Sequence, residues 1–178
     1  LQADGIDLSE NMIGIAKEAD PEGRYETADM TEYFPPQKYD LVTCTGDALN
    51  HIPALGDLGR IFENVYAYLS PGGYFIFDLL DESEISTEEP FDLQFDEHIS
   101  ARFQITRPAQ TQVHLQTQVF EDGVHSFTED IFETVHDREA VLSLLGQAGF
   151  SLEKCAHRLL DEGADVATWY VIARKISA

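Results

Sequence analysis

The chain has 178 residues, 33 of them acidic and 11 Lys or Arg, which leaves a formal net charge of −22. With 43% hydrophobic residues it can bury the core of one domain, which excludes disordered, collagen-like and disulfide-scaffold proteins. The acidic excess disfavours nucleic acid and anionic membranes as partners and favours a small neutral or cationic ligand. Cys44 and Cys155 lie in apolar stretches without metal-ligand spacing. We therefore expect reduced core thiols and a cytoplasmic protein.

The first 80 or so residues alternate short apolar runs with helical patterns, which predicts parallel βαβ units. A strand at 3–7 is followed by a helix with Ser9 as its N-cap. Further strands are expected near Arg24–Ala28 and at Tyr39–Thr45, and the second of these is apolar enough to be covered on both faces. A helix is then expected over roughly 57–69. The Ser-Pro-Gly-Gly segment after it should end that helix before a buried strand at 74–79.

The composition changes after Asp81. Residues 81–97 are rich in acids and contain no Lys or Arg, which is typical of a solvated connector. Three strand-like runs follow, at Arg102–Thr106, Gln112–Phe120 and His125–Val135, and a turn signal at 121–123 joins the last two. We expect an antiparallel β subdomain, inserted into the α/β core as a cap at about 83–136.

The end of the chain predicts a helix capped by Asp137 and ended by Gly149, followed by strands at Phe150–His157 and Thr168–Lys175. These strands follow each other without a crossover helix, so they should pair antiparallel. The expected fold class is α/β. It comprises one domain over 1–178, with a doubly wound, mostly parallel sheet, helices on both faces and an antiparallel last strand.

Asp7 is the first candidate binding residue. A carboxylate at the carboxyl end of a parallel strand faces the crevice where such sheets bind ligands. It has two acceptor oxygens, so it could take both hydroxyl protons of a ribose. The alternative is an acid that merely benefits from the dipole of the helix that follows.

Several segments resemble, in the same order, motifs of class I S-adenosylmethionine-dependent methyltransferases, which have a Rossmann-like fold. They are GIDLSENM at 5–12, ADM at 28–30, YDLV at 39–42 and LSPGG at 69–73. The segment CTGDALNH at 44–51 resembles the strand end of a small-molecule branch of that family. The resemblance implies transfer of a methyl group from S-adenosylmethionine to a small-molecule acceptor, without nucleic acid or membrane.

The resemblance also assigns residues to the cofactor. Asp7 would hold the ribose hydroxyls, and Leu8 and Met12 would pack on the adenine. The Asp29 carboxylate would accept from the adenine amino group, and the backbone amide of Met30 would meet a ring nitrogen. Taken alone, Met12 could equally be a core methionine, and Asp29 could be a loop acid that caps its own turn.

Thr45 and Gly46 would end the third strand opposite the methyl group, and a glycine there allows close backbone approach. Asp47 and His51 would orient or deprotonate the acceptor. Asp47 could instead cap the next helix, and His51 could be an ordinary imidazole. The remaining histidines stand singly, so we expect no metal site.

One family feature is absent upstream of Asp7, namely the glycine-rich loop after the first strand. We therefore expect the chain to begin one βα unit late, with a central strand missing between the strand of Asp7 and Tyr39–Thr45. Two alternatives stay open. One is a non-catalytic methyltransferase-like binding protein. The other is a nicotinamide-dependent oxidoreductase, which the antiparallel C-terminal pair disfavours. The acceptor and the oligomeric state are undecided.

Overall fold

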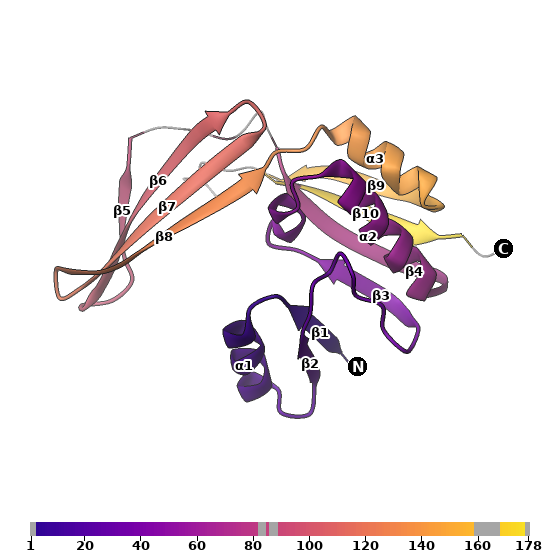
Figure 1. Cartoon of the computed structure of the whole chain (residues 1–178), viewed down its shortest axis with the longest axis horizontal. Coiled ribbons are helices and arrows are strands. Elements are labelled where there is room, and N and C mark those ends of the chain that lie inside the picture. Colours follow the sequence, from indigo (N-terminus) through magenta and orange to yellow (C-terminus); the bar gives the residue numbers. More distant parts are fainter. Residues whose placement is uncertain (1–2, 82–84, 86–88, 159–167, 177–178) are drawn as a thin grey trace.

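The computed structural model describes residues 3–81, 85, 89–158 and 168–176. Figure 1 shows an α/β core, a small βαβ unit beside it, and a long sheet that projects away from the core. Within the described residues these parts form three sheets of two, four and four strands. The α/β class with an inserted antiparallel sheet is confirmed.

The small unit consists of β1 (Asp4–Asp7), α1 (Glu10–Ala19) and β2 (Arg24–Thr27), with the two strands parallel. The predicted cap of α1 is present, since the Ser9 side chain accepts a hydrogen bond from the Met12 amide at 3.3 Å. Ile13 is the buried residue of this helix. α1 therefore packs one residue onto the unit and exposes most of its other apolar side chains.

The core sheet has the order β3 (Tyr39–Cys44), β4 (Leu69–Leu80), β10 (Thr168–Lys175), β9 (Phe150–Arg158). β3 and β4 are parallel, whereas β10 is antiparallel to both of its neighbours. The reversed last strand is thus confirmed. The sheet is mixed rather than mostly parallel, because β1 and β2 form a separate sheet in the described part of the chain.

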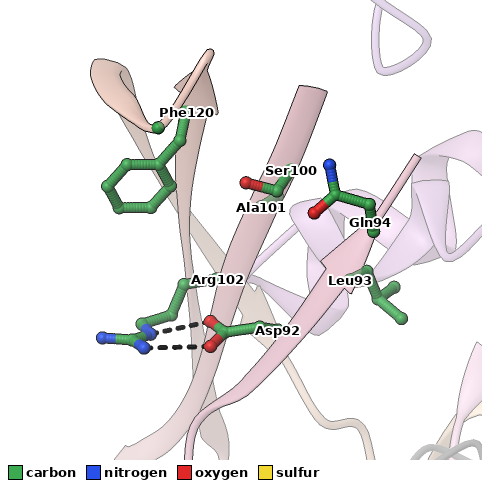
Figure 2. Close-up of a pocket in the computed structure, with 8 residues that line it drawn as sticks. Asp92, Leu93, Gln94, Ser100, Ala101, Arg102 and Phe120 are labelled. Carbon is green, nitrogen blue, oxygen red and sulfur yellow. Dashed lines mark hydrogen bonds and ion pairs between the residues drawn. The ribbon is translucent and has the colours of Figure 1, made fainter. Parts of the chain in front are cut away.

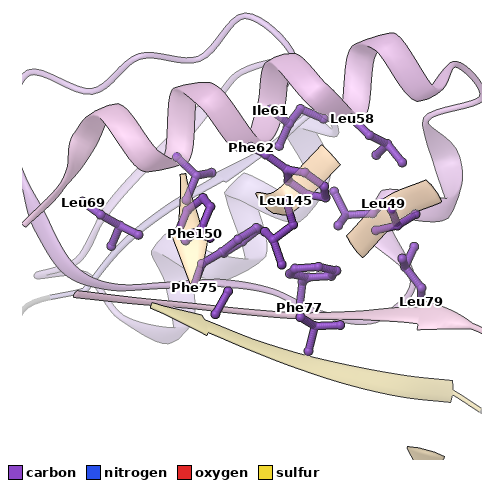
Figure 3. Packing of buried hydrophobic residues seen from close by; sticks show 14 of the residues in the cluster. Leu49, Leu58, Ile61, Phe62, Leu69, Phe75, Phe77, Leu79, Leu145 and Phe150 are labelled. Atoms are coloured by element: carbon purple, nitrogen blue, oxygen red, sulfur yellow. The ribbon is translucent and has the colours of Figure 1, made fainter. Parts of the chain in front are cut away.

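The core lies between this sheet and the helices α2 (Leu55–Tyr68) and α3 (Arg138–Gln147), as Figure 3 shows. Alternate residues of β4 and β10 share one face, with Phe77 opposite Val171 in the register. The buried cluster comprises Leu49, Leu58, Ile61, Phe62, Val65, Leu69, Phe75, Phe77, Leu79, Val141, Leu145, Phe150, Trp169, Val171 and Ala173. α3 begins as predicted, with the Asp137 side chain accepting from the Ala140 amide at 2.8 Å.

Two expectations for the core need correction. β3 is not covered on both faces, since Leu41 is 52% exposed and both α2 and α3 contribute to the same buried cluster. The Ser70–Gly73 segment belongs to β4 rather than to a loop, because Leu69 pairs with Tyr39 before an irregularity in the register. Gly73 permits this pairing, since a Cβ there would lie 2.9 Å from the Ser70 carbonyl oxygen and 3.0 Å from that of Asp40.

The inserted sheet has four antiparallel strands in sequence order. They are β5 (Phe91–Gln94), β6 (Ile99–Ala109), β7 (Gln112–Glu121) and β8 (Val124–Thr134). Asp122 and Gly123 form the predicted hairpin turn with φ values of 50° and 77°. β5 lies inside the segment expected to be a connector. Its Phe91 stacks on Phe103 of β6 at 5.3 Å, a pairing that composition alone does not reveal.

β1 and β3 each have one edge that pairs with nothing among the described residues. Side chains connect the two strands at their beginnings. The Asp4 carboxylate of β1 accepts from Gln37 Nε2 at 2.6 Å and from the Tyr39 hydroxyl at 2.7 Å. These bonds hold the small unit beside β3 by polar contacts rather than by a backbone ladder.

Candidate active site

A tight turn at the carboxyl end of β3 forms the centre of the candidate site. Gly46 and Asp47 both have left-handed backbone conformations, with φ values of 78° and 58°. Asp78 of β4 stabilises this turn. Its carboxylate, only 3% exposed as a residue, accepts from the Gly46 amide at 3.0 Å and the Asp47 amide at 3.1 Å. The two amide donors compensate a buried charge that would otherwise be costly.

The 3-10 helix η1 (Ala48–His51) follows this turn. Asp47 makes no side-chain capping bond to η1, so the alternative role of a helix cap is not realised in the structure. Asn50 is fully buried. Its Oδ1 accepts from the Leu80 amide at 3.2 Å and its Nδ2 donates to the Thr134 carbonyl at 2.8 Å. Asn50 therefore joins the ends of β4 and β8. Its two side-chain bonds give it a structural role.

Glu133 of β8 meets η1 at this point, and sequence analysis missed it. Its Oε1 lies 3.8 Å from His51 Nε2, and its side chain is 15% exposed against 49% for His51. Burial and the negative charge of Asp47 raise the pKa of Glu133 to about 7. Burial and Asp78 likewise raise the pKa of Asp47, whereas His51 lowers it. The inserted sheet thus contributes a carboxyl group to the end of β3.

The predicted cofactor residues at the end of β1 are accessible. Asp7 Oδ1 accepts from the Ser9 amide at 2.7 Å. Leu8 is 74% exposed and Met12 is 53% exposed. Met12 is therefore not a core methionine. Two exposed apolar side chains beside a carboxylate are chemically suited to an adenine ring and its ribose.

Asp29 follows β2 at the same edge as Asp7, because β1 and β2 are parallel and the Ala28 amide donates to the Asp7 carbonyl. Asp29 Oδ1 accepts from the Thr31 amide at 2.8 Å and from the Thr31 hydroxyl at 2.7 Å, and these bonds lower the pKa of Asp29. The turn-capping role is therefore real, and it keeps the side chain ionised and ordered. The side chain of Met30 packs against the main core.

Thr45 and Gly46 are exposed at the end of β3. A Cβ on Gly46 would meet nothing within 4 Å. The left-handed backbone conformation of Gly46, rather than crowding, therefore explains why this position favours glycine. The structure therefore brings Thr45, Gly46, Asp47 and His51 to one strand end, and Asp7 and Asp29 to the edge of the small sheet.

A hollow of about 470 Å³ lies on the inserted sheet, away from these residues (Figure 2). It is lined by residues of β5 and β6 together with Phe120 and Gly123. The positively charged side chain in this hollow is Arg102, which already donates two hydrogen bonds of 2.8 and 2.9 Å to Asp92. The described residues contain no group of three or more His, Cys, Asp or Glu that could hold a metal ion. No helix among them is long and apolar enough to cross a membrane.

Part of the chain matches a known protein family. Residues 1–73 match the family described as "Methyltransferase domain". One relative is a protein of Geobacillus sp. (strain WCH70) that is named as a methyltransferase. It is 34% identical over 80 residues, which are 42% of this chain and 32% of that protein. The match thus spans about a third of that relative's length.

Two solved structures share the fold over nearly the whole chain. An S-adenosylmethionine-dependent methyltransferase of Clostridium acetobutylicum has a TM-score of 0.81 at 21% identity, covering 100% of this chain and 76% of its own. An amino pentose methyltransferase of Micromonospora echinaspora, solved with S-adenosylmethionine bound, has a TM-score of 0.77 at 18% identity, covering 98% and 74%. Residues 1–73 thus match a methyltransferase family, and the chain shares its fold with S-adenosylmethionine-dependent methyltransferases.

Proposed function

We propose that the protein transfers a methyl group from S-adenosylmethionine to a small-molecule acceptor that carries an amine. The observation that carries the proposal is the meeting of Asp47, His51 and Glu133 at the end of β3 in a methyltransferase fold. These groups can orient an acceptor and remove its proton. The strongly acidic chain favours a cationic acceptor over nucleic acid.

The cofactor side is formed by residues that the structure leaves accessible. Asp7 would hold the ribose hydroxyls, and Leu8 and Met12 would cover the adenine. Asp29 and the Met30 amide would meet the edge of the base, and Thr45 and Gly46 would border the reacting centre. When bound, S-adenosylmethionine supplies an activated methyl group. The protein then contributes alignment, which can be worth roughly 7–11 kcal/mol.

Support for an amine comes from two directions. The charge of Asp47 raises the pKa of Glu133, and that of Asp78 raises the pKa of Asp47, and a bound ammonium group would relieve this repulsion. The structural neighbour from Micromonospora echinaspora is named for an amino pentose acceptor. We propose that residues 1–178 act within one methyltransferase domain, with 83–136 as its cap.

The test is a transfer assay on the full-length protein. S-adenosylhomocysteine release is measured by mass spectrometry with an amino pentose and with its hydroxyl counterpart. We expect release with the amine, at least about tenfold slower release with the alcohol, and strong loss in Asp47→Asn and His51→Gln. Exchange of the exposed His98 for Gln serves as the control and should leave the rate unchanged. Equal rates in His51→Gln and the unchanged protein would contradict the proposal.

A further inference from the structure

The junction between the inserted sheet and the core carries one inference beyond the proposed function. β8 runs back from the tip of the inserted sheet to the core (Figure 1), and its last residues meet η1. Asn50 fixes this junction by donating to the Thr134 carbonyl at 2.8 Å. Thr134 directly follows Glu133, so the backbone that carries Glu133 is held in place next to His51.

Glu133 faces no charged partner across its own sheet register. Its register partner on β7 is Val113, which is buried and apolar. The charged groups that face Glu133 come from elsewhere. They are Asp47 from the turn after β3 and His51 from η1, with Asp78 of β4 behind Asp47. Among the described residues no Lys or Arg forms an ion pair with Glu133. The imidazole is therefore the group that its carboxylate can hold.

His51 is exposed and would otherwise choose among several side-chain rotamers. Resting on the proposed function, we propose that Glu133 is a positioning residue, through which the inserted sheet holds the His51 imidazole beside Asp47. At 3.8 Å the two groups attract each other when His51 carries a proton and Glu133 is ionised. Glu133 thereby restrains the imidazole as it takes the acceptor's proton. The cap completes the acceptor end through this single carboxyl group.

A double-variant cycle in the transfer assay tests this role. We compare Glu133→Gln, His51→Gln and the double variant in the full-length protein, with the amino pentose as acceptor. A residue that acts through His51 adds nothing once His51 is gone. We expect Glu133→Gln to lower kcat about tenfold with a smaller change in KM, and the double variant to equal His51→Gln. Glu133→Asp should recover part of kcat, because it keeps the charge.

Two further measurements separate positioning from folding. Glu129→Gln changes an exposed carboxylate on the same strand and should leave kcat unchanged. The dissociation constant of S-adenosylhomocysteine, measured by calorimetry, should stay within about twofold in Glu133→Gln. The pH profile of kcat should lose a limb near pH 7 in Glu133→Gln, because that carboxyl titrates there.

The outcomes distinguish this inference from the function on which it rests. Losses that multiply in the double variant, or an unchanged pH profile in Glu133→Gln, overturn the positioning role while methyl transfer stands. If the full-length protein transfers no methyl group to any acceptor offered, the proposed function and this inference both fail. Non-multiplying losses together with an altered pH profile support the inference.

Discussion

The pKa values of the carboxyl groups at the end of β3 depend on burial and on neighbouring charges. Glu133 titrates near pH 7 because burial and the charge of Asp47 both disfavour its ionised form. Asp47 responds in the same direction to burial and to Asp78. Asp29 shifts the opposite way, because two hydrogen bonds from Thr31 stabilise its charge. Burial and like charges thus raise pKa values at the end of β3, whereas hydrogen bonds lower the pKa of Asp29.

Removing the charge of Asp47 should lower the pKa of Glu133. The variant Asp47→Asn keeps the size of the side chain but removes one of the two causes of the raised pKa, so the pKa should fall from about 7 toward the ordinary glutamate range. Carbon-detected NMR titration of the glutamate carboxyls measures this. Exchange of the distant Asp40 for Asn is the control and should leave the titration of Glu133 in place.

The raised pKa of Glu133 also predicts how stability depends on pH. Between the ordinary glutamate pKa and about 7, the folded protein holds a proton at Glu133 that the unfolded chain releases. Stability from this group therefore falls as the pH rises through that window. Glu133→Gln should flatten this fall and be the more stable protein at pH 8. Urea unfolding at pH 5 and pH 8 measures it, and a parallel fall in both proteins would refute the prediction.

At the cofactor edge, Asp7→Ala should weaken binding of S-adenosylhomocysteine to the full-length protein by about 1–3 kcal/mol. It removes the carboxylate that would accept the ribose hydroxyls. Asp29→Ala should cost less, because the adenine would keep its contact with the Met30 amide. Calorimetry measures both, with Asp20→Ala as a surface control. Unchanged affinity in Asp7→Ala would reject the assignment.

At the scale of elements, the site depends on a turn after β3 that hydrogen bonds to Asp78 of β4 stabilise. Asp78 is part of a buried strand, yet its carboxylate binds the two amides that begin the left-handed turn after β3. Asn50 then fixes η1 between the ends of β4 and β8. The position of His51 is thus set by two buried polar side chains that touch no ligand.

Asp78→Ala should unfold this turn and destabilise the protein by about 2–4 kcal/mol, since the amides of Gly46 and Asp47 lose their buried carboxylate acceptor. Chemical denaturation measures the change. Asp40→Ala, an exposed carboxylate on the neighbouring β3, should shift stability by no more than about 0.5 kcal/mol. Equal small effects in the two variants would show that the turn forms without Asp78.

At the scale of the whole molecule, the chain combines a compact core with a long sheet and a net charge of −22. The core supplies one buried cluster between α2, α3 and one face of the mixed sheet. The βαβ unit attaches through the bonds of Asp4 to Gln37 and Tyr39. Excess negative charge of this size repels itself in the folded state.

Screening that repulsion should stabilise the protein. We expect Tm to rise by several degrees between about 10 mM and 500 mM NaCl, as the Debye length falls from about 30 Å to a few ångströms. Differential scanning calorimetry at both salt concentrations measures this. Potassium chloride is the control and should act equally, because screening does not depend on the monovalent cation. A Tm that is constant or falls with salt would contradict the prediction.

The sequence by itself determined the features that depend on neighbours along the chain. Ser9 and Asp137 cap their helices because each accepts from an amide three residues ahead. The turn at Asp122 and Gly123 and the antiparallel last strands follow in the same way from local turn chemistry and a short connection. The order of the methyltransferase motifs likewise predicted the family model that residues 1–73 match.

Only the tertiary structure decided which distant residues meet. Asp78 lies more than 30 residues from the turn it holds, and Glu133 lies more than 80 residues from His51. Periodicity reports which face of a strand is apolar, but it does not report which strand end lies against which helix. The buried, structural role of Asn50 is a result of the same kind, since its partners lie on β4 and β8. Long-range packing sets both the burial and the neighbouring charges, and these determine how a carboxyl group behaves.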